Sequence, residues 1–298
     1  MQEIQLKTPH LELAGLRWGK ATGIPVLALH GWLDNAASFV PLAPLLSDHS
    51  RETLDIVAID WPGHGRSQHR HESTHYYFAD YLWDIHATLD ALGWDSCHIV
   101  AHSMGGAIST IFAAAAPQRV RSLVLVDGLG PITDPASKTT HQLRRSSENL
   151  RGRPRRRKNY TSVDDMVQAR LANSDMTEDA ARLITERSVQ QTGDGFEWTN
   201  DPRLYWHSPV HFTEEQVLDC LQHIESPALC LGAVPFSPWL SEERYLVRKQ
   251  ALKTGRFELI NGGHHFHMEQ AELIAPKVQC FILDQELEYR SRSGNQNI

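Results

Sequence analysis

Short apolar runs recur along the first 130 residues of the chain, and stretches with helical spacing lie between them. Four of these runs are almost continuously apolar, at residues 25–29, 56–59, 97–101 and 123–126. Such runs are typical of parallel strands that helices cover on both faces. Between two of the runs, apolar side chains step by three or four residues from Phe78 to Leu92, and Gly93 follows as a stop. The alternation predicts a doubly wound α/β fold around a mostly parallel sheet.

The strand rhythm is lost between about residues 131 and 225, where the spacing indicates helices at 163–172 and 178–189. It resumes afterwards, with two strands and two helices predicted at residues 228–231, 257–260, 241–251 and 268–287. We therefore predict one α/β core domain formed by residues 1–130 and 226–298, with a helical cap of residues 131–225 inserted in it.

Composition is that of an ordinary globular protein, with 41% apolar and 22% charged residues. The longest apolar stretch, residues 108–116, is far shorter than the ~20 residues that cross a bilayer, so no membrane span is expected. The start of the chain lacks the layout of a secretory signal, which predicts a cytoplasmic protein. The cysteines have neither CxxC spacing nor histidine partners, and we expect reduced thiols rather than a metal site at Cys97, Cys220, Cys230 and Cys280.

The net charge of −7 argues against generic nucleic-acid binding. One segment, residues 138–158, has the opposite balance, with nine Lys or Arg and one Glu. Such a basic block ordinarily forms a solvated surface. The alternative interpretation is that it binds an acidic substrate or RNA. The sequence does not predict the oligomeric state.

Residues 101–105, which read Ala-His-Ser-Met-Gly, predict a nucleophilic serine at Ser103. A serine hydroxyl is well exposed in a sharp turn between a strand and a helix, where small residues two positions away let the two elements approach. Ser103 follows an apolar run and precedes a helix-forming stretch, and Ala101 adds one methyl to the usual glycine position. The N-terminus of that helix also favours developing negative charge.

The backbone N–H groups of Trp32 and Met104 are the predicted oxyanion donors. Met104 directly follows the serine, which is the usual position of one donor. The sequence His30-Gly31-Trp32 ends an apolar run, and Gly31 lets the backbone turn so that the Trp32 amide faces the site. A tight turn without a catalytic role is the alternative interpretation of this motif.

With Gly262-Gly263-His264 near the end of the chain, these motifs resemble the α/β-hydrolase superfamily. The resemblance rests on HGWLDN at 30–35, DWPGHGRS at 60–67 and AHSMGG at 101–106, so it covers nearly the whole chain. HGWLDN, with residues 126–131 and 200–204, is more narrowly similar to the Kraken-type serine hydrolase-like group. The resemblance implies the α/β-hydrolase fold and a reaction that needs no cofactor.

The catalytic base is predicted at His264, in the loop between the last strand and the final helix. His264 directly follows the glycine pair, as in the family's G-x-H pattern, so we choose it over His265 and His267. An imidazole at this place can take the serine proton and later deliver it to the leaving group.

The triad acid is predicted at Asp127. Many family members place the acid after the strand that follows the cap, but residues 232–238 contain no carboxylate. Asp127 stands at the end of the strand before the cap, a position that haloalkane dehalogenases use. Glu242 or Glu243 is the alternative acid, and capping of a turn is the non-catalytic interpretation of Asp127.

These residues predict hydrolysis of a carboxylic ester or thioester of a small molecule through an acyl-enzyme on Ser103. Alternatives are cleavage of a carbon–carbon or amide bond by the same triad, or a catalytically idle binding protein. Several aromatic side chains are candidates for an acyl pocket, although core packing explains them equally well: Trp32, Trp61, Trp198, Tyr205 and Trp206. One histidine-rich loop lacks metal-ligand spacing, so we expect no metal at His64, His69, His71 and His75.

Overall fold

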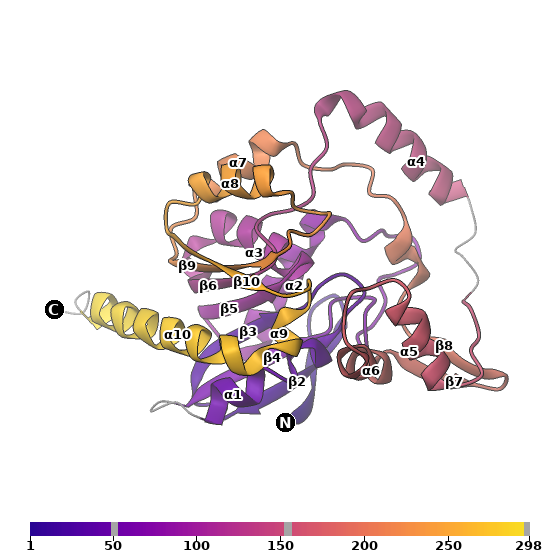
Figure 1. Ribbon diagram of the computed structural model, residues 1–298, viewed down its shortest axis with the longest axis horizontal. Coiled ribbons are helices and arrows are strands. Elements are labelled where there is room, and N and C mark those ends of the chain that lie inside the picture. Colours follow the sequence, from indigo (N-terminus) through magenta and orange to yellow (C-terminus); the bar gives the residue numbers. More distant parts are fainter. Residues whose placement is uncertain (49–52, 152–156, 295–298) are drawn as a thin grey trace.

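The computed structural model describes residues 1–48, 53–151 and 157–294. Its main strands are β1 (Gln2–Lys7), β2 (Glu12–Gly19), β3 (Ile24–Leu29), β4 (Leu54–Ile59), β5 (Cys97–His102), β6 (Val120–Val126), β9 (Ala228–Val234) and β10 (Gly255–Asn261). They form one sheet in the order β1-β2-β4-β3-β5-β6-β9-β10 (Figure 1). Pairing is parallel from β4 to β10, while β1 and β2 add antiparallel strands at one edge. The predicted mostly parallel sheet is confirmed, and β1 is a further strand that the apolar pattern does not predict.

Alternate side chains of the central strands enter two separate apolar cores, one on each face of the sheet. Leu27 and Leu29 point to the face that is covered by α2 (Tyr81–Leu92), α3 (Met104–Ala115), α7 (Glu214–Gln222) and α8 (Glu242–Ala251). Val26 and Ala28 point to the opposite face, which is covered by α1 (Ala43–Asp48), α9 (Phe266–Glu269) and α10 (Ala271–Gly294) (Figure 1). None of the helices in the described ranges has both the length and the apolarity that a bilayer span requires.

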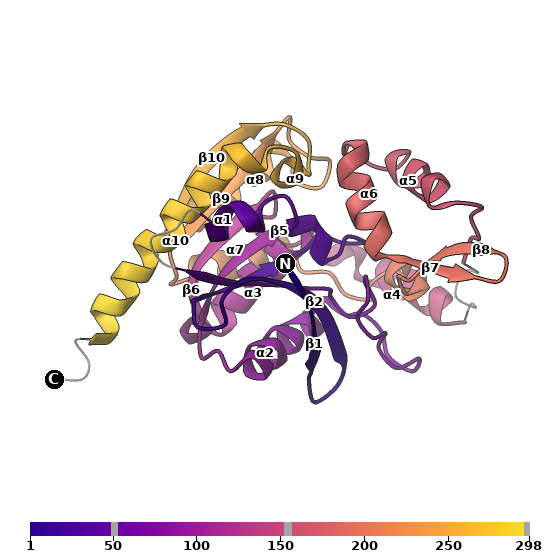
Figure 2. The same cartoon turned by 90° about the horizontal axis from the view of Figure 1, so that it is seen from below.

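The segment between β6 and β9, here called the β6–β9 insertion, projects to one side of the sheet (Figures 1 and 2). Its projecting part contains α4 (Thr139–Arg151), α5 (Val163–Leu171), α6 (Glu178–Arg187), β7 (Val189–Thr192) and β8 (Gly195–Trp198). The predicted helices are present as α5 and α6. Of the basic block 138–158, residues 152–156 lie outside the described part of the chain.

Besides the predicted helices, the insertion contains two strands that were not predicted from the sequence, because β7 and β8 pair as an antiparallel hairpin. Helix α6 ends at Arg187, and residues 193–194, Gly-Asp, form the two-residue loop that tight hairpins favour. Gly195 has φ 136°, and a Cβ there would overlap the Tyr160 carbonyl oxygen, so this position requires glycine.

Helix α7 lies within the range predicted for the cap, yet it packs in the helix layer over the sheet. Val217 and Leu221 are buried in the same core as α3 and α8. The helix begins with a capping box, in which Thr213 and Gln216 each accept a backbone N–H of the other. The division of the chain into core and cap stays a prediction.

Candidate active site

Ser103 occupies the turn between β5 and α3, with backbone angles φ 52° and ψ −116°. A positive φ is unfavourable for a residue with a side chain, and this strain is typical of a nucleophile elbow. The turn is tight, because a Cβ added to Gly105 would overlap the Leu29 carbonyl oxygen. Ala101 is fully buried, so its methyl is accommodated in the core. The Ser103 N–H donates to the Val126 carbonyl at 2.9 Å, which ties the elbow to β6.

His264 links Ser103 to Asp127. Its Nε2 lies 2.8 Å from Ser103 Oγ, and its Nδ1 lies 2.5 Å from Asp127 Oδ2. His264 comes from the loop after β10, whereas Asp127 directly follows β6 and has φ 44°. The other carboxylate oxygen of Asp127 accepts the Ala233 N–H at 3.1 Å. The structure thus brings the three predicted side chains into one hydrogen-bonded row.

The Asp127 carboxylate is nearly buried, with 4% of its side chain exposed, while 18% of His264 is exposed. Burial alone would raise the pKa of Asp127, but the hydrogen bond and charge of His264 and the Ala233 N–H hold this pKa below its usual value. The ionised carboxylate accepts the Nδ1–H of His264, which leaves Nε2 to accept the Ser103 hydroxyl proton. This arrangement can activate a serine hydroxyl by general-base catalysis.

The residues considered as alternative catalytic bases or acids lie in other surroundings than the row formed by Ser103, His264 and Asp127. His265 Nε2 lies 3.3 Å from Asp34 Oδ2, and His267 Nε2 lies 2.7 Å from Ser38 Oγ. Both rings are buried. The alternative carboxylates are exposed in the first turn of α8: Glu242 and Glu243. None of these four side chains forms a hydrogen bond with Ser103 in the described structure.

The predicted oxyanion donors lie close to Ser103. Met104 is the first residue of α3, and the first amides of a helix have no acceptor within it. Trp32 follows Gly31, and a Cβ added to Gly31 would lie 3.1 Å from Ser103 Cβ, so this backbone passes beside the nucleophile. Among the residues that the structure describes, neither the Trp32 nor the Met104 amide has a hydrogen-bond acceptor. Both N–H groups are therefore available to a ligand.

Trp32 and Tyr205 form an exposed aromatic pair between the loop after β3 and the β6–β9 insertion. Their rings meet edge to face at a centroid distance of 5.5 Å, with 47% of Trp32 and 51% of Tyr205 exposed. Trp32 Nε1 also donates to the Leu204 carbonyl at 3.2 Å, so the loop after β3 contacts the β6–β9 insertion. The other aromatic candidates pack in the core or against other rings: Trp61, Trp198 and Trp206.

A buried ion network adjoins the site, and it was not predicted from the sequence. Asp34 Oδ2 lies 3.4 Å from His102 Nδ1 and 3.3 Å from His265 Nε2, and Arg170 donates to the other oxygen of Asp34. The potential ligand atoms of Asp34, His102 and His265 lie within 4.8 Å of one another, as a metal site requires. Burial lowers the pKa of His265, but Asp34 and Asp175 outweigh it and raise that pKa to about 9. Both oxygens of the Asp34 carboxylate thus have side-chain partners within this buried network.

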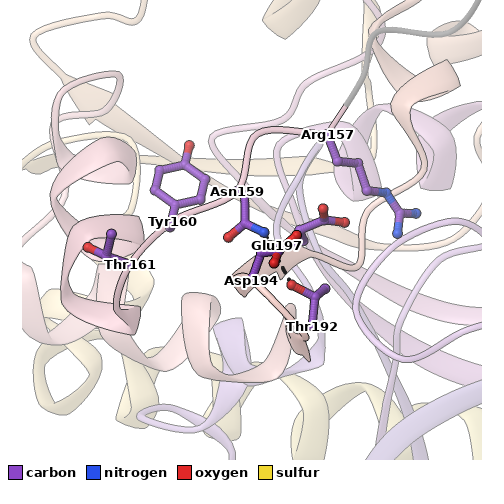
Figure 3. A pocket seen from close by; sticks show the side chains of 7 residues that line it. All are labelled: Arg157, Asn159, Tyr160, Thr161, Thr192, Asp194 and Glu197. Carbon is purple, nitrogen blue, oxygen red and sulfur yellow. Dashed lines mark hydrogen bonds between the residues drawn. The ribbon is translucent and has the colours of Figure 1, made fainter.

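Two further features lie apart from Ser103. A polar hollow of about 400 Å³ lies in the β6–β9 insertion (Figure 3). None of the residues that line this hollow is a predicted site residue. The lining residues are Arg157, Asn159, Tyr160, Thr161, Thr192, Asp194 and Glu197. The four histidines between residues 64 and 75, all within the described structure, each bond or stack with different neighbours and form no common ligand set.

Comparison with known proteins identifies the family. The profile of the alpha/beta hydrolase fold family matches residues 24–271. A serine hydrolase-like protein of Danio rerio is 30% identical over 305 residues, which cover 99% of this chain and 92% of the relative. Serine hydrolase-like protein 2 of Homo sapiens is 28% identical over 300 residues, which cover 95% and 94% of the two chains.

Solved structures agree with this placement. A hypothetical protein from Pseudomonas aeruginosa PAO1 has a TM-score of 0.87 at 33% identity, over 94% of this chain and 99% of that chain. A thioesterase domain from the curacin biosynthetic pathway has a TM-score of 0.81 at 23% identity, over 93% and 98% of the two chains, and shows the fold alone. The resemblance seen in the motifs is thereby confirmed. The chain belongs to the α/β-hydrolase fold family, within its serine hydrolase-like group.

Proposed function

We propose that the chain hydrolyses a carboxylic ester or thioester of a small molecule through an acyl-enzyme on Ser103. The observation that carries this proposal is the row of hydrogen bonds from Ser103 Oγ through His264 to Asp127, at 2.8 and 2.5 Å. A serine, a histidine and a carboxylate joined in this order are the machinery of acyl transfer. Membership of the serine hydrolase-like group supports a hydrolytic reaction.

In the first half of the reaction, His264 Nε2 takes the hydroxyl proton while Ser103 Oγ bonds to the substrate's carbonyl carbon. The carbonyl oxygen becomes an oxyanion, which the N–H groups of Trp32 and Met104 receive. The adduct then collapses, the C–O or C–S bond breaks, and His264 gives the proton to the departing alcohol or thiol. Asp127 stabilises the imidazolium that forms meanwhile.

In the second half, water enters and loses a proton to His264 as its oxygen bonds to the acyl carbon. The same two N–H groups receive the oxyanion again. The bond to Ser103 Oγ breaks, the serine regains the proton from His264, and the carboxylic acid leaves. The enzyme thus returns to its starting state without any cofactor.

The β6–β9 insertion is assigned the role of a cap beside the site. Its contact with the loop after β3, through Trp32 and Tyr205, supports this role. Half-exposed aromatic rings that begin at the proposed oxyanion donor Trp32 favour an acyl group of hydrocarbon character. Esters and thioesters both suit the mechanism, because an alcohol or a thiol can leave from the same adduct.

Labelling with a fluorophosphonate probe tests the nucleophile. The wild-type protein is expected to label, and so is Ser147→Ala, which changes an exposed serine on α4. Ser103→Ala is expected not to label. A wild-type protein that fails to label would refute the serine mechanism and favour an idle binding protein.

Hydrolysis assays with p-nitrophenyl esters of graded acyl length, and with the matching acyl thioesters, test the substrate class. Turnover by the wild type that disappears in Ser103→Ala supports the proposal. A protein that labels but cleaves none of these substrates would refute it, and would leave an amide or a carbon–carbon bond as the target of the same triad.

A further inference from the structure

The Arg170 side chain, near the end of α5, reaches from the β6–β9 insertion to the loop that follows β3. Its Nη1 donates to the Leu33 carbonyl at 2.7 Å, and its Nη2 donates to Asp34 Oδ1. Only 13% of the Arg170 side chain and 2% of the Asp34 side chain are exposed. Because the pair is shielded from water, loss of the arginine would leave Asp34 buried with one cation fewer.

The loop that Arg170 contacts has a strained backbone. Leu33 has φ 61°, in the left-handed region that favours glycine. A residue with a side chain keeps such a conformation only where its surroundings fix it. The Asp34 N–H closes the turn on the Gly31 carbonyl at 3.2 Å, and Arg170 binds the Leu33 carbonyl. Trp32, whose N–H is the proposed oxyanion donor, lies inside this turn.

Side chains also hold both backbone hydrogen-bonding groups of His264. Asp175, in the segment after α5, accepts the His264 N–H at 3.1 Å. His102 Nε2 donates to the His264 carbonyl at 3.0 Å. Gly263 permits the first contact, because a Cβ there would lie 2.8 Å from Asp175 Oδ2. The position of the His264 backbone therefore depends on side chains that do not touch the reacting atoms.

Electrostatic contacts join these two loops. Asp34 Oδ2 lies 3.3 Å from the Nε2 of His265, the residue after the proposed base, and the Nδ1 of His265 lies 3.9 Å from Asp175. Arg170, Asp34, His265 and Asp175 thus alternate in charge along a path through both loops. Two of the four side chains, Arg170 and Asp175, come from one short segment of the β6–β9 insertion.

We propose that Arg170 is a positioning residue: by holding Leu33 and Asp34, it keeps the proposed oxyanion donor and the base aligned on Ser103, without touching substrate. Asp175 has the same role to a smaller extent, because 59% of its side chain is exposed and water competes for its contacts. The inference rests on the proposed function, and it gives the insertion a part in assembling the catalytic residues.

Kinetics on the p-nitrophenyl ester that the wild type cleaves fastest test the catalytic consequence. Arg170→Met keeps the aliphatic stem but removes both hydrogen bonds. It is expected to lower kcat about 10- to 100-fold with little change in KM, because small displacements of catalytic groups cost this much. Arg170→Lys should recover part of the loss, since an ammonium can reach one of the two acceptors. Asp175→Ala should lower kcat less than Arg170→Met does.

Arg182→Met is the matched control. Arg182 lies on α6 with 36% of its side chain exposed, and it pairs with Asp164 and Glu178 on the surface. Its kinetics should equal those of the wild type. An unchanged kcat in Arg170→Met, or a raised KM alone, would overturn the positioning role. If Arg170→Met does not fold, Arg170→Lys decides: a lowered kcat at constant KM supports the role and wild-type kinetics overturn it.

Hydrogen–deuterium exchange separates this inference from the proposed function, because it requires no turnover. In Arg170→Met, peptides that cover residues 31–35 and 262–266 should exchange faster than in the wild type, whereas Arg182→Met should leave both unchanged. A wild type that neither labels nor cleaves an ester would refute the proposed function. Hydrogen–deuterium exchange of Arg170→Met would then still test whether Arg170 positions the two loops. Faster exchange in both segments supports this positioning role, and unchanged exchange overturns it.

Discussion

The Asp127 carboxylate lies 2.5 Å from His264 Nδ1, although 137 residues separate the two along the chain. They meet because β6, β9 and β10 are parallel neighbours, so that all three strands end at the same edge of the sheet. The Asp127 N–H also donates to the Leu231 carbonyl of β9 at 2.8 Å. An acid at the end of β6 can therefore reach the same histidine as an acid at the end of β9.

Replacement of Asp127 by asparagine is expected to lower kcat about 10⁴-fold while the fold is retained. The amide has nearly the same shape, but it neither fixes the required tautomer of His264 nor stabilises the imidazolium. Rates of ester hydrolysis measure the effect, with circular dichroism as the check on folding. Glu242→Gln is the control and should keep a near-normal kcat. Normal turnover in Asp127→Asn would contradict the assignment.

The sheet and the elbow could be predicted because their signals are local. A parallel strand that is covered on both faces needs apolar side chains at nearly every position, and residues 25–29 and 97–101 meet this need as parts of β3 and β5. The turn at Ser103 needs a small residue two positions after it, and Gly105 is visible in the sequence without knowledge of the packing.

The ion network could not be predicted, because its partners are far apart along the chain. Arg170 and Asp34 are 136 residues apart, and a sequence displays each charge without its partner. The position of Asp34, within a motif that follows a buried strand, is the one available hint that a cation must face it. The hairpin of β7 and β8 did leave a local signal, the Gly-Asp pair at residues 193–194 between aromatic and β-branched residues.

Two substitutions at the elbow should differ in their effect on stability. Gly105→Ala would overlap the Leu29 carbonyl oxygen, which is backbone and cannot move aside, so a loss of about 3 kcal/mol is expected. Ala101→Gly removes one buried methyl from a strand and should cost only about 1 kcal/mol. Urea unfolding followed by tryptophan fluorescence compares the two variants. Equal stability of Gly105→Ala and the wild type would show that the strand and the helix are not in close contact there.

The buried pair of Asp60 and Arg187 should anchor α6 to the core. Arg187 Nε lies 2.9 and 3.1 Å from the two oxygens of Asp60, which is fully buried. Arg187→Met leaves this carboxylate without its cation and should lower the free energy of unfolding by about 3 to 5 kcal/mol. Asp60→Asn combined with Arg187→Met should recover part of the loss, because no unpaired charge then remains. An effect as small as that of the exposed control Arg182→Met, below about 1 kcal/mol, would contradict the anchor.

Buried neutral histidines should make the protein sensitive to acid. Burial lowers the pKa of His30 and His102 to about 4 and that of His64 to about 3. In the unfolded chain these rings titrate at about 6.5, so between that pH and about 4 the unfolded state binds more protons than the folded state. The free energy of unfolding should therefore fall as the pH drops below about 6.5, by at most about 1.4 kcal/mol per pH unit for each ring.

His265 should have the opposite effect on the alkaline side. Its pKa is raised to about 9, so its contribution to stability is complete below about 6.5 and is lost as the pH rises towards 9. Urea unfolding at pH 5, 6, 7, 8 and 9 should then show a maximum near neutral pH. His64→Gln should flatten the acid side and His265→Gln the alkaline side, because each variant removes one of the titrating rings. If the wild type unfolds at the same urea concentration from pH 5 to pH 7, the buried rings are not held neutral and the prediction is wrong.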